Sequence, residues 1–252
     1  MIKVTILGNG NLATHLTRVF IKKKEIDLVQ VYSRNIEKMK HLSEKVSITD
    51  NLLDLKDADV YIIAISDNSI AEFSSQLNLK GKFVVHTSGS ITMDTLKGDF
   101  SRGVFYPLQT FTKGKKIKFK SIPICIEASN EDDLIILEKL AREISNDVRR
   151  ITSLEREKLH LAAVFVNNFV NHMYQKANEI CDDNYLPFDI LYPLIKETAK
   201  KIESISPMDA QTGPAKRNDS KTIEKHLEQL NSSQKEIYTT LTKSITNSFT
   251  TK

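Results

Sequence analysis

Residues 2–13 read IKVTILGNGNLA and join a short apolar, β-branched run to a glycine-rich turn with the spacing G-x-G-x-x-A. A helical pattern through Phe20 follows the turn at once. In a dinucleotide-binding unit, the first glycine makes the tight turn, the second lets the backbone approach a pyrophosphate, and the small third residue allows close helix–strand packing. The pyrophosphate then lies on the free N–H groups of the helix N-terminus. The residues expected to bind these phosphates are Gly8, Asn9, Gly10, Asn11 and Leu12.

The end of the second predicted strand, Leu28 to Tyr32, indicates which dinucleotide binds. NAD enzymes usually place Asp or Glu there, about 20 residues after the glycines, to bind the ribose hydroxyls. This chain has Ser33 and Arg34 instead. A carboxylate would repel the 2′-phosphate of NADP, whereas a guanidinium can bind it with two charge-assisted hydrogen bonds. Ser33 and Arg34 therefore favour NADP, and the alternative is that Arg34 is an ordinary solvated loop arginine.

Length and composition allow one large domain or two modest ones. The chain has 252 residues, of which 40% are hydrophobic and 27% charged, and these are ordinary values for a globular protein. A net charge of +4 is small for this length and gives no case for a nucleic-acid partner. The densest basic run, KGKKIKFK at 113–120, is interpreted as a solvated loop that leads into a strand.

We expect a cytoplasmic protein that has no membrane partner and no metal. The first strand begins at residue 2, so we expect no signal peptide, and no apolar stretch is long enough to span a bilayer. Cys125 and Cys181 have neither metal-binding nor redox-motif spacing. Both are therefore predicted to be unpaired thiols in a reducing compartment.

Strands and helices alternate through residue 152, and only helical periods follow from residue 153 onward. Such alternation indicates a doubly wound parallel sheet. The predicted fold class is therefore α/β, with an N-terminal doubly wound Rossmann sheet at 1–152 and an all-helical C-terminal domain at 153–252. The predicted strands are 2–7, 28–32, 47–49, 58–66, 82–86, 103–106, 122–126 and 147–151, and the clearest helices of this half are 36–44 and 131–145.

The helical half begins with a long predicted helix over 155–180. Its middle, LAAVFV at 161–166, is apolar on every side, so we expect it to be buried all round by other helices or by another subunit. A homodimer through the helical domain is the expected assembly. The stretch SPMDAQTGPAKRND at 206–219 is polar and punctuated by proline and glycine, which predicts a loop.

Polar residues gather where the predicted parallel strands end, and ligands of open α/β sheets bind at such ends. Ser66 and Asp67 either line the path of the cofactor ribose or cap the following helix. His86 and Ser88 follow the next strand, where the nicotinamide end of the cofactor is expected. Ser88 is expected to bind the cofactor. His86 either orients substrate and donates a proton near pH 7, or is a buried histidine satisfied by the backbone.

The long helix carries a second group of polar residues. His160, Asn167 and Asn171 share one face at about 100° per residue, and Asn168 lies about 80° from His160. Polar groups that flank an apolar run need partners if they are buried, and a ligand pocket, capping groups or a subunit contact could supply them. His160 and Asn168 are the candidates for the active site, whereas Asn171 and His172 are interpreted as structural.

The chain resembles a known group in its element order and in several motifs. GNGNLA, ADVYIIAISDNSI and the helical second half are similar to the 6-phosphogluconate-dehydrogenase-like superfamily, which includes pyrroline-5-carboxylate reductase, ketopantoate reductase and hydroxyisobutyrate dehydrogenase. Four more specific motifs are HTSGS, GVFYPLQTF, EKLHLAAVFVNNF and TGPAKRND. They resemble the bacterial Rossmann-like family with a C-terminal domain of unknown function, whose members are often labelled candidate NADP or deazaflavin-dependent oxidoreductases.

The resemblance implies that the first helix of the C-terminal half supplies catalytic polar groups that face the nicotinamide. Many dehydrogenases of the superfamily use a lysine and an asparagine one turn apart there, but Val164 follows His160 and Ala162 follows Lys158 in this chain. The lysine-based mechanism is therefore not carried over, and the residues typical of the narrower family are His160 and Asn168. Some relatives have histidine where this chain has Tyr106, which weakens the case for a catalytic role at that position.

These observations predict an NADP-dependent oxidoreductase that moves a hydride between nicotinamide and a small carbonyl or imine substrate. His160 is expected to transfer a proton and Asn168 to orient the substrate, with His86 lining the site. Gln109 and Arg217 are weaker candidates for substrate binding, Arg217 by pairing with a carboxylate. Two alternatives remain open: a protein that binds or senses NADP(H) without catalysis, and a deazaflavin-dependent NADP reductase.

Overall fold

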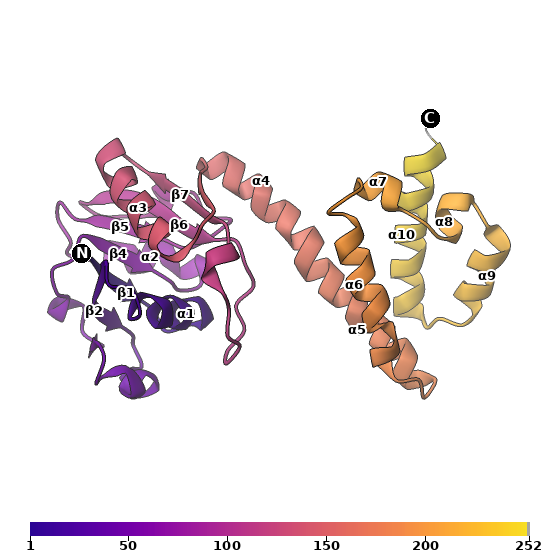
Figure 1. Ribbon diagram of the computed structural model, residues 1–252, viewed down its shortest axis with the longest axis horizontal. Coiled ribbons are helices and arrows are strands. Elements are labelled where there is room, and N and C mark those ends of the chain that lie inside the picture. Colours follow the sequence, from indigo (N-terminus) through magenta and orange to yellow (C-terminus); the bar gives the residue numbers. More distant parts are fainter. Residues whose placement is uncertain (251–252) are drawn as a thin grey trace. The chain divides into compact units, whose positions relative to one another are not determined.

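The computed structural model describes residues 1–250, which divide into two compact units, Met1–Asn168 and a second unit from Phe169 onward. The first unit is built on one sheet (Figure 1). Its strands are β1 (Ile2–Leu7), β2 (Ile26–Tyr32), β3 (Ser47–Thr49), β4 (Val60–Ile63), β5 (Phe83–His86), β6 (Ser101–Pro107), β7 (Ile124–Ala128) and β8 (Val148–Arg150). Its helices are α1 (Asn11–Phe20), α2 (Ile70–Ser75), α3 (Glu131–Ile144) and α4 (Ser153–Ala163).

The strand order is β3-β2-β1-β4-β5-β6-β7-β8, so the chain moves outward from β1 in one direction and then from β4 in the other. This reversal between β1 and β4 is the switch point at which open α/β sheets bind ligands. The strands pair in parallel except for β6 and β7, which are antiparallel. The predicted doubly wound sheet is confirmed, with one antiparallel step beyond the prediction.

The central strands are apolar because both faces of the sheet are covered. All four residues of β4 are buried, and they alternate between two apolar clusters, Val60 and Ile62 in one and Tyr61 and Ile63 in the other. Since successive side chains of a strand point to opposite faces, the two clusters lie on opposite faces of the sheet. The strand is shorter than the predicted 58–66 because its partner β1 ends at Leu7, opposite Ile63.

The long helix predicted over 155–180 is confirmed, although it includes a local irregularity. Helix α4 passes into a π-helical stretch, Val164–Phe169, and then into α5 (Val170–Asp183). Within residues 1–250, the other helices of this chain do not bury 161–166, since Leu161, Phe165 and Val166 are 55%, 60% and 72% exposed, and burial by another subunit stays a prediction. A run that is apolar on all sides of one helix cannot turn every side chain toward a single sheet. The compact units divide within this helix, whereas the predicted boundary at 152/153 coincides with the start of α4.

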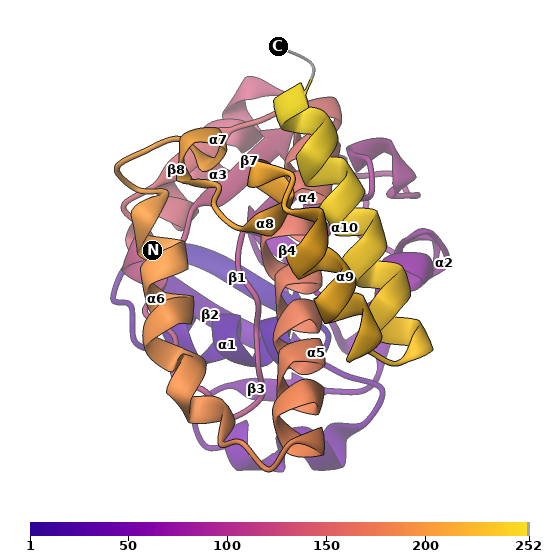
Figure 2. The same cartoon turned by 90° about the vertical axis from the view of Figure 1, so that its right-hand side faces the viewer.

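The second unit contains helices and no strand within residues 169–250 (Figures 1 and 2). The predicted loop over 206–219 is wrong in part, because two short helices begin there. Both start at a proline, whose fixed φ suits the first position of a helix and whose missing N–H costs no hydrogen bond there. After α5 the helices are α6 (Tyr192–Lys201), α7 (Pro207–Ala210), α8 (Pro214–Arg217), α9 (Ser220–Glu228) and α10 (Ser232–Thr250).

Candidate active site

The glycine turn after β1 has the geometry that the sequence predicts for an anion site. Gly8 has φ +138°, and a Cβ on it would collide with the backbone carbonyl of Ala64, so only glycine fits this position. Gly10 precedes α1, which has no side-chain cap and no acidic residue in its first turn. No atom lies within 4 Å of the position that a Cβ on Gly10 would occupy. The first amides of α1 are therefore not claimed by any capping side chain, and the space beside Gly10 is open to an anion.

A cavity of about 630 Å³ lies over this turn. Every residue predicted to bind the cofactor lines it except Ser88. Arg34 and Lys38 bring two cations to the end of β2, and neither side chain has a recorded ion-pair or hydrogen-bond partner within residues 1–250. Lys38 was missed by the sequence analysis, although it lies one turn beyond Arg34. The predicted residues that meet in this cavity are Gly8, Asn9, Gly10, Asn11, Leu12, Ser33, Arg34, Ser66 and Asp67.

Ser88 lies close to the first cavity without lining it, because it binds Asp67. The hydroxyls of Ser88 and Ser90 both donate to Oδ2 of Asp67, each at 2.7 Å. Ser66 precedes a short 3₁₀ turn but makes no side-chain cap there, and its hydroxyl lies 3.1 Å from that of Ser69. The carboxylate of Asp67 therefore ties the end of β4 to the loop after β5, and this loop carries Ser88.

His86 lies at the end of β5 and is fully buried. Its Nε2 is 3.3 Å from the carbonyl oxygen of Thr92, and its Nδ1 accepts the backbone N–H of Ser88 at 3.1 Å. Burial, with a smaller contribution from the positive charge of Arg156, lowers the pKa of His86 to about 4. The ring is therefore neutral at pH 7 and lines neither large cavity. This geometry matches the buried, backbone-satisfied histidine and gives no support to proton donation by His86.

A second cavity of about 560 Å³ brings together three other predicted residues, His160, Asn168 and Gln109. Asn167 lines it as well, from the same face of the helix as His160. The rest of the wall is mostly apolar, and the lining contains no Asp, Glu, Lys or Arg. The cavity therefore offers neutral hydrogen-bonding groups in an apolar setting.

Tyr106 is the residue of this cavity that the sequence analysis set aside. Its hydroxyl lies 3.1 Å from Nδ1 of His160, and the two rings meet edge to face. Burial raises the pKa of Tyr106 to about 12, so the phenol keeps its proton at neutral pH. Tyr106 stands near the carboxyl end of β6, and the rule that ligands bind at such ends is the signal that could have found it.

One loop borders both cavities. Thr87 lines the first cavity, and two residues later Gly89 touches the Tyr106–His160 pair of the second. A Cβ on Gly89 would lie 2.5 Å from Nδ1 of His160 and 2.8 Å from the hydroxyl oxygen of Tyr106. Only a residue without a side chain lets the backbone come this close. The loop over 86–90 therefore runs from the wall of the dinucleotide cavity to the residue pair that lines the second cavity.

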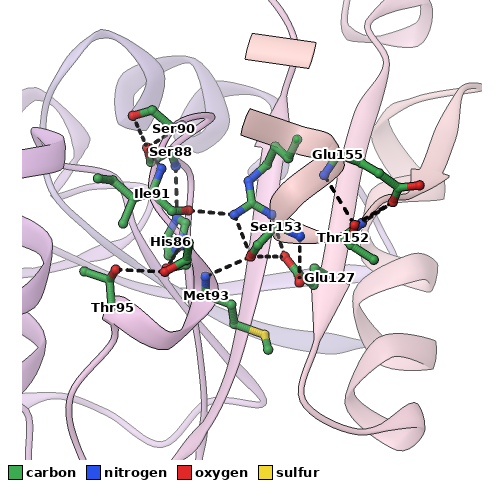
Figure 3. A network of polar contacts seen from close by, with 12 residues as sticks. His86, Ser88, Ser90, Ile91, Met93, Thr95, Glu127, Thr152, Ser153 and Glu155 are labelled. Atoms are coloured by element: carbon green, nitrogen blue, oxygen red, sulfur yellow. Dashed lines mark hydrogen bonds and ion pairs between the residues drawn. The ribbon is translucent and has the colours of Figure 1, made fainter. Parts of the chain in front are cut away.

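A buried ion pair fixes the start of α4 against the sheet. Arg156 is 0% exposed and donates to Glu127 of β7 at 2.5 Å and to the carbonyl of Ile91 at 2.6 Å. Ser153 donates to the same carboxylate and accepts the N–H of Met93, so strand, loop and helix converge at one point (Figure 3). His160 follows Arg156 by one turn, and this network therefore sets the position of His160.

One predicted site residue lies outside this arrangement. Arg217 belongs to the second unit, in the last turn of α8, and its role in substrate binding stays a prediction. Within residues 1–250, no group of three or more His, Cys, Asp or Glu side chains could hold a metal ion. In the same range, no helix combines the length and apolar character needed to cross a membrane.

The sheet order, the glycine turn and the cavity over α1 together define a dinucleotide-binding protein of the Rossmann class. Residues 3–89 match the family described as NADP oxidoreductase, coenzyme F420-dependent, and residues 122–245 match a domain of unknown function, DUF2520. The chain is 40% identical to a candidate NADP oxidoreductase from Bacteroides fragilis, over 98% of both chains and with a TM-score of 0.89. It therefore belongs to the family of proteins that combine an NADP oxidoreductase domain with a C-terminal DUF2520 domain, which confirms the resemblance found in the sequence.

More distant solved structures share the fold. A pyrroline-5-carboxylate reductase from Streptococcus pyogenes is 14% identical, covers 98% of both chains and has a TM-score of 0.66. An imine reductase from Myxococcus stipitatus in complex with NADP⁺ is 12% identical, with a TM-score of 0.69 over 98% of this chain and 92% of its own. At these identities the likeness shows the fold alone. No curated protein sequence matches the chain.

Proposed function

We propose that this protein is an NADP-dependent oxidoreductase that transfers a hydride between nicotinamide and a small carbonyl or imine substrate. The observation that carries the proposal is the loop over 86–90, in which Thr87 lines the dinucleotide cavity and Gly89 lies against Tyr106 and His160 of the second cavity. Hydride transfer requires the nicotinamide and the reacting carbon to be held in contact. Thr87 in the wall of the first cavity and Gly89 against two wall residues of the second are two positions apart on this loop, which would bring the two ligands together.

The residues of the first cavity suit NADP. The amides of the glycine turn and of the first turn of α1 would hold the pyrophosphate, because no side chain caps them. Arg34 and Lys38 would bind the 2′-phosphate, and Ser33, Ser66 and Asp67 would contact the ribose groups. When bound, the cofactor would supply the hydride. Ser88 acts by holding Asp67 in place.

The residues of the second cavity would bind the substrate and move its proton. His160 transfers the proton at the reacting oxygen or nitrogen, and Asn168 orients the substrate through its amide. Gln109 accepts the N–H of Thr110 through its side-chain oxygen at 2.8 Å, so its NH₂ group remains to donate to a ligand. His86, as a buried neutral ring, supports the loop between the cavities.

A deazaflavin-dependent NADP reductase is the second candidate, because the family that matches residues 3–89 is described as coenzyme F420-dependent. A third possibility is that the protein binds or senses NADP(H) without turnover. The three differ in what oxidises bound NADPH: a small carbonyl or imine, a deazaflavin, or nothing.

The first experiment is thermal unfolding of the purified protein with NADPH, NADP, NADH and NAD. A ligand at about 100 times its dissociation constant adds about 2.7 kcal/mol to the free energy of unfolding, which gives a clear shift. We expect the shift with the phosphorylated pair. Oxidation of NADPH is then followed with small carbonyls, imines and coenzyme F420. No stabilisation by any of the four dinucleotides would contradict the proposal.

We also propose that the protein is a cytoplasmic homodimer that associates through its helical domain. Both cysteines are free, as predicted, which suits a reducing compartment. Large apolar side chains of the second unit are exposed, as expected of a surface that another chain covers. Light scattering should give twice the mass of one chain, and a monomer at micromolar concentration would refute the dimer. The exposed side chains are Leu186, Ile190, Leu194, Ile202, Ile205, Met208 and Leu241.

A further inference from the structure

We propose that Tyr106 and His160 form a proton relay, and that this neutral pair suits the second cavity to a carbonyl substrate rather than an imine. The inference rests on the proposed function and narrows its substrate class. Both residues line the cavity, and the Tyr106 hydroxyl lies 3.1 Å from Nδ1 of His160. The other ring nitrogen, Nε2, has no recorded partner within residues 1–250.

The relay requires one direction for the hydrogen bond between Tyr106 and His160. Tyr106 remains a phenol at neutral pH, and Nδ1 of His160 is the partner recorded for its hydroxyl in residues 1–250. In the proposed relay the phenol donates and Nδ1 accepts, which places the proton of a neutral imidazole on Nε2. Gly89 lies against this pair, and its lack of a side chain lets the two groups meet undisturbed. The result is an N–H donor on the ring nitrogen that Tyr106 does not occupy.

The charge of the cavity separates carbonyls from imines. An imine accepts hydride most readily as an iminium cation, and a cation in an apolar cavity needs a carboxylate nearby. The lining of the second cavity contains no carboxylate. A carbonyl enters uncharged and develops negative charge on oxygen as the hydride adds, so it needs a hydrogen-bond donor at that oxygen. Nε2–H of His160 is such a donor.

The proposed reduction moves one hydride and two protons. The hydride forms a bond to the carbonyl carbon, and the electron pair of the C=O π bond moves to the oxygen. Nε2 of His160 gives its proton to that oxygen while the Tyr106 hydroxyl gives its proton to Nδ1. The imidazole stays neutral throughout, and the product is an alcohol. The tyrosinate then takes its proton back from Nδ1 while Nε2 takes one proton from water, which restores the starting state.

The state of His160 can be read without turnover. In the full chain saturated with NADP, ¹⁵N NMR of His160 should show Nε2 protonated and Nδ1 as an acceptor. Tyr106→Phe removes only the hydroxyl and should release this preference, whereas Tyr185→Phe, a change at a residue that is 97% exposed, should leave it intact. A proton on Nδ1 in the wild type, or an unchanged His160 spectrum in Tyr106→Phe, would overturn the relay.

The substrate class is tested with matched rings, using cyclic ketones and cyclic imines of equal size as oxidants of NADPH. Ketones should be reduced, and Tyr106→Phe should lower their turnover about 100-fold, the smaller end of what proton transfer contributes, with NADPH stabilisation unchanged. Reduction of imines in preference to ketones would overturn the substrate class but leave the proposed function standing. Failure of the proposed function would show differently, as no stabilisation by NADPH, while the NMR measurement would still decide the relay.

Discussion

The two cavities of the first unit are built in different ways. The dinucleotide cavity takes much of its wall from the glycine turn and the first turn of α1, where uncapped backbone amides and a missing Cβ leave room for an anion. The second cavity depends on side chains that are distant in the sequence, since Tyr106 and His160 are 54 positions apart. In the proposed function, local backbone geometry would bind the cofactor, whereas the substrate site would depend on how β6, α4 and the loop over 86–90 pack together. The variants below separate these two kinds of site.

The largest effect is expected at Arg156, which anchors α4 and with it the second cavity. Arg156→Met leaves the carboxylate of Glu127, whose side chain is only 17% exposed, without its buried partner. Breaking a buried pair on one side costs about 3–5 kcal/mol of unfolding free energy. Urea unfolding measures this loss, and NADPH should still stabilise the fraction that folds because the glycine turn is untouched.

Arg142→Met is the matched control for that experiment. Arg142 also pairs with a glutamate, Glu138, but its side chain is 58% exposed. Exposed ion pairs contribute about 1 kcal/mol or less. Equal losses in the two variants would show that the network around Arg156 does not hold α4 in place.

The protonation of His86 tests the loop over 86–90, which contacts residues of both cavities. Its pKa in the folded protein is about 4, against 6.5 as its ordinary value. Between pH 4 and pH 6.5, His86 is protonated in the unfolded chain and neutral in the folded chain. The free energy of unfolding therefore falls by up to about 3 kcal/mol as the pH falls from 6.5 to 4, and this contribution is constant above 6.5.

Urea unfolding at several pH values measures this dependence, and NMR follows the titration of the His86 ring directly. His41→Gln, at an exposed histidine, should leave the His86 titration unchanged. A His86 ring that titrates near pH 6.5 in the folded protein would contradict its burial as a neutral group. It would also reopen the possibility that His86 donates a proton.

The contrast between the cavities explains what could be predicted from the sequence. The strands, the glycine turn and the residues around the first cavity follow from short-range patterns, namely apolar runs, glycine spacing and strand ends. His160 and Asn168 could be placed on one helix, but their partner Tyr106 could not be assigned, because the contact requires β6 and α4 to meet in space. Which helices or subunit would cover Leu161 and Val166 could not be predicted either, since periodicity shows which residues are apolar but not what covers them.

Two glycine substitutions should disrupt the function of one cavity each. Gly89→Ala forces a methyl group against His160 and Tyr106, and a displacement of about 1 Å at a reacting group can lower turnover about 100-fold. NADPH stabilisation should survive in this variant. Gly10→Ala has open space in the unliganded protein but places a methyl group where the cofactor approaches, so NADPH stabilisation should be lost.

The readouts of this pair are thermal unfolding with NADPH and the ¹⁵N spectrum of His160 without cofactor. We expect Gly10→Ala to lose stabilisation by NADPH and to keep the wild-type ¹⁵N spectrum of His160. We expect Gly89→Ala to keep stabilisation by NADPH and to change the ¹⁵N spectrum of His160. Loss of both readouts in Gly89→Ala would mean that the two cavities form one cooperative site and cannot be disrupted separately.

The smallest effect is expected at Arg34. Its replacement separates the contribution of this side chain to cofactor binding from that of the backbone amides in the first cavity. A charge-assisted hydrogen bond contributes about 1.5–3 kcal/mol, and the exposure of Arg34 favours the lower end. Arg34→Ala should therefore weaken NADPH binding about tenfold, since 1.4 kcal/mol is a factor of ten, and leave NADH binding unchanged. Arg18→Ala, at an exposed arginine of α1 outside the cavity lining, is the control. If Arg34→Ala weakens NADPH and NADH equally, the arginine contributes only general positive charge. The preference for the phosphorylated cofactor would then have to come from Lys38, the other cation at the end of β2.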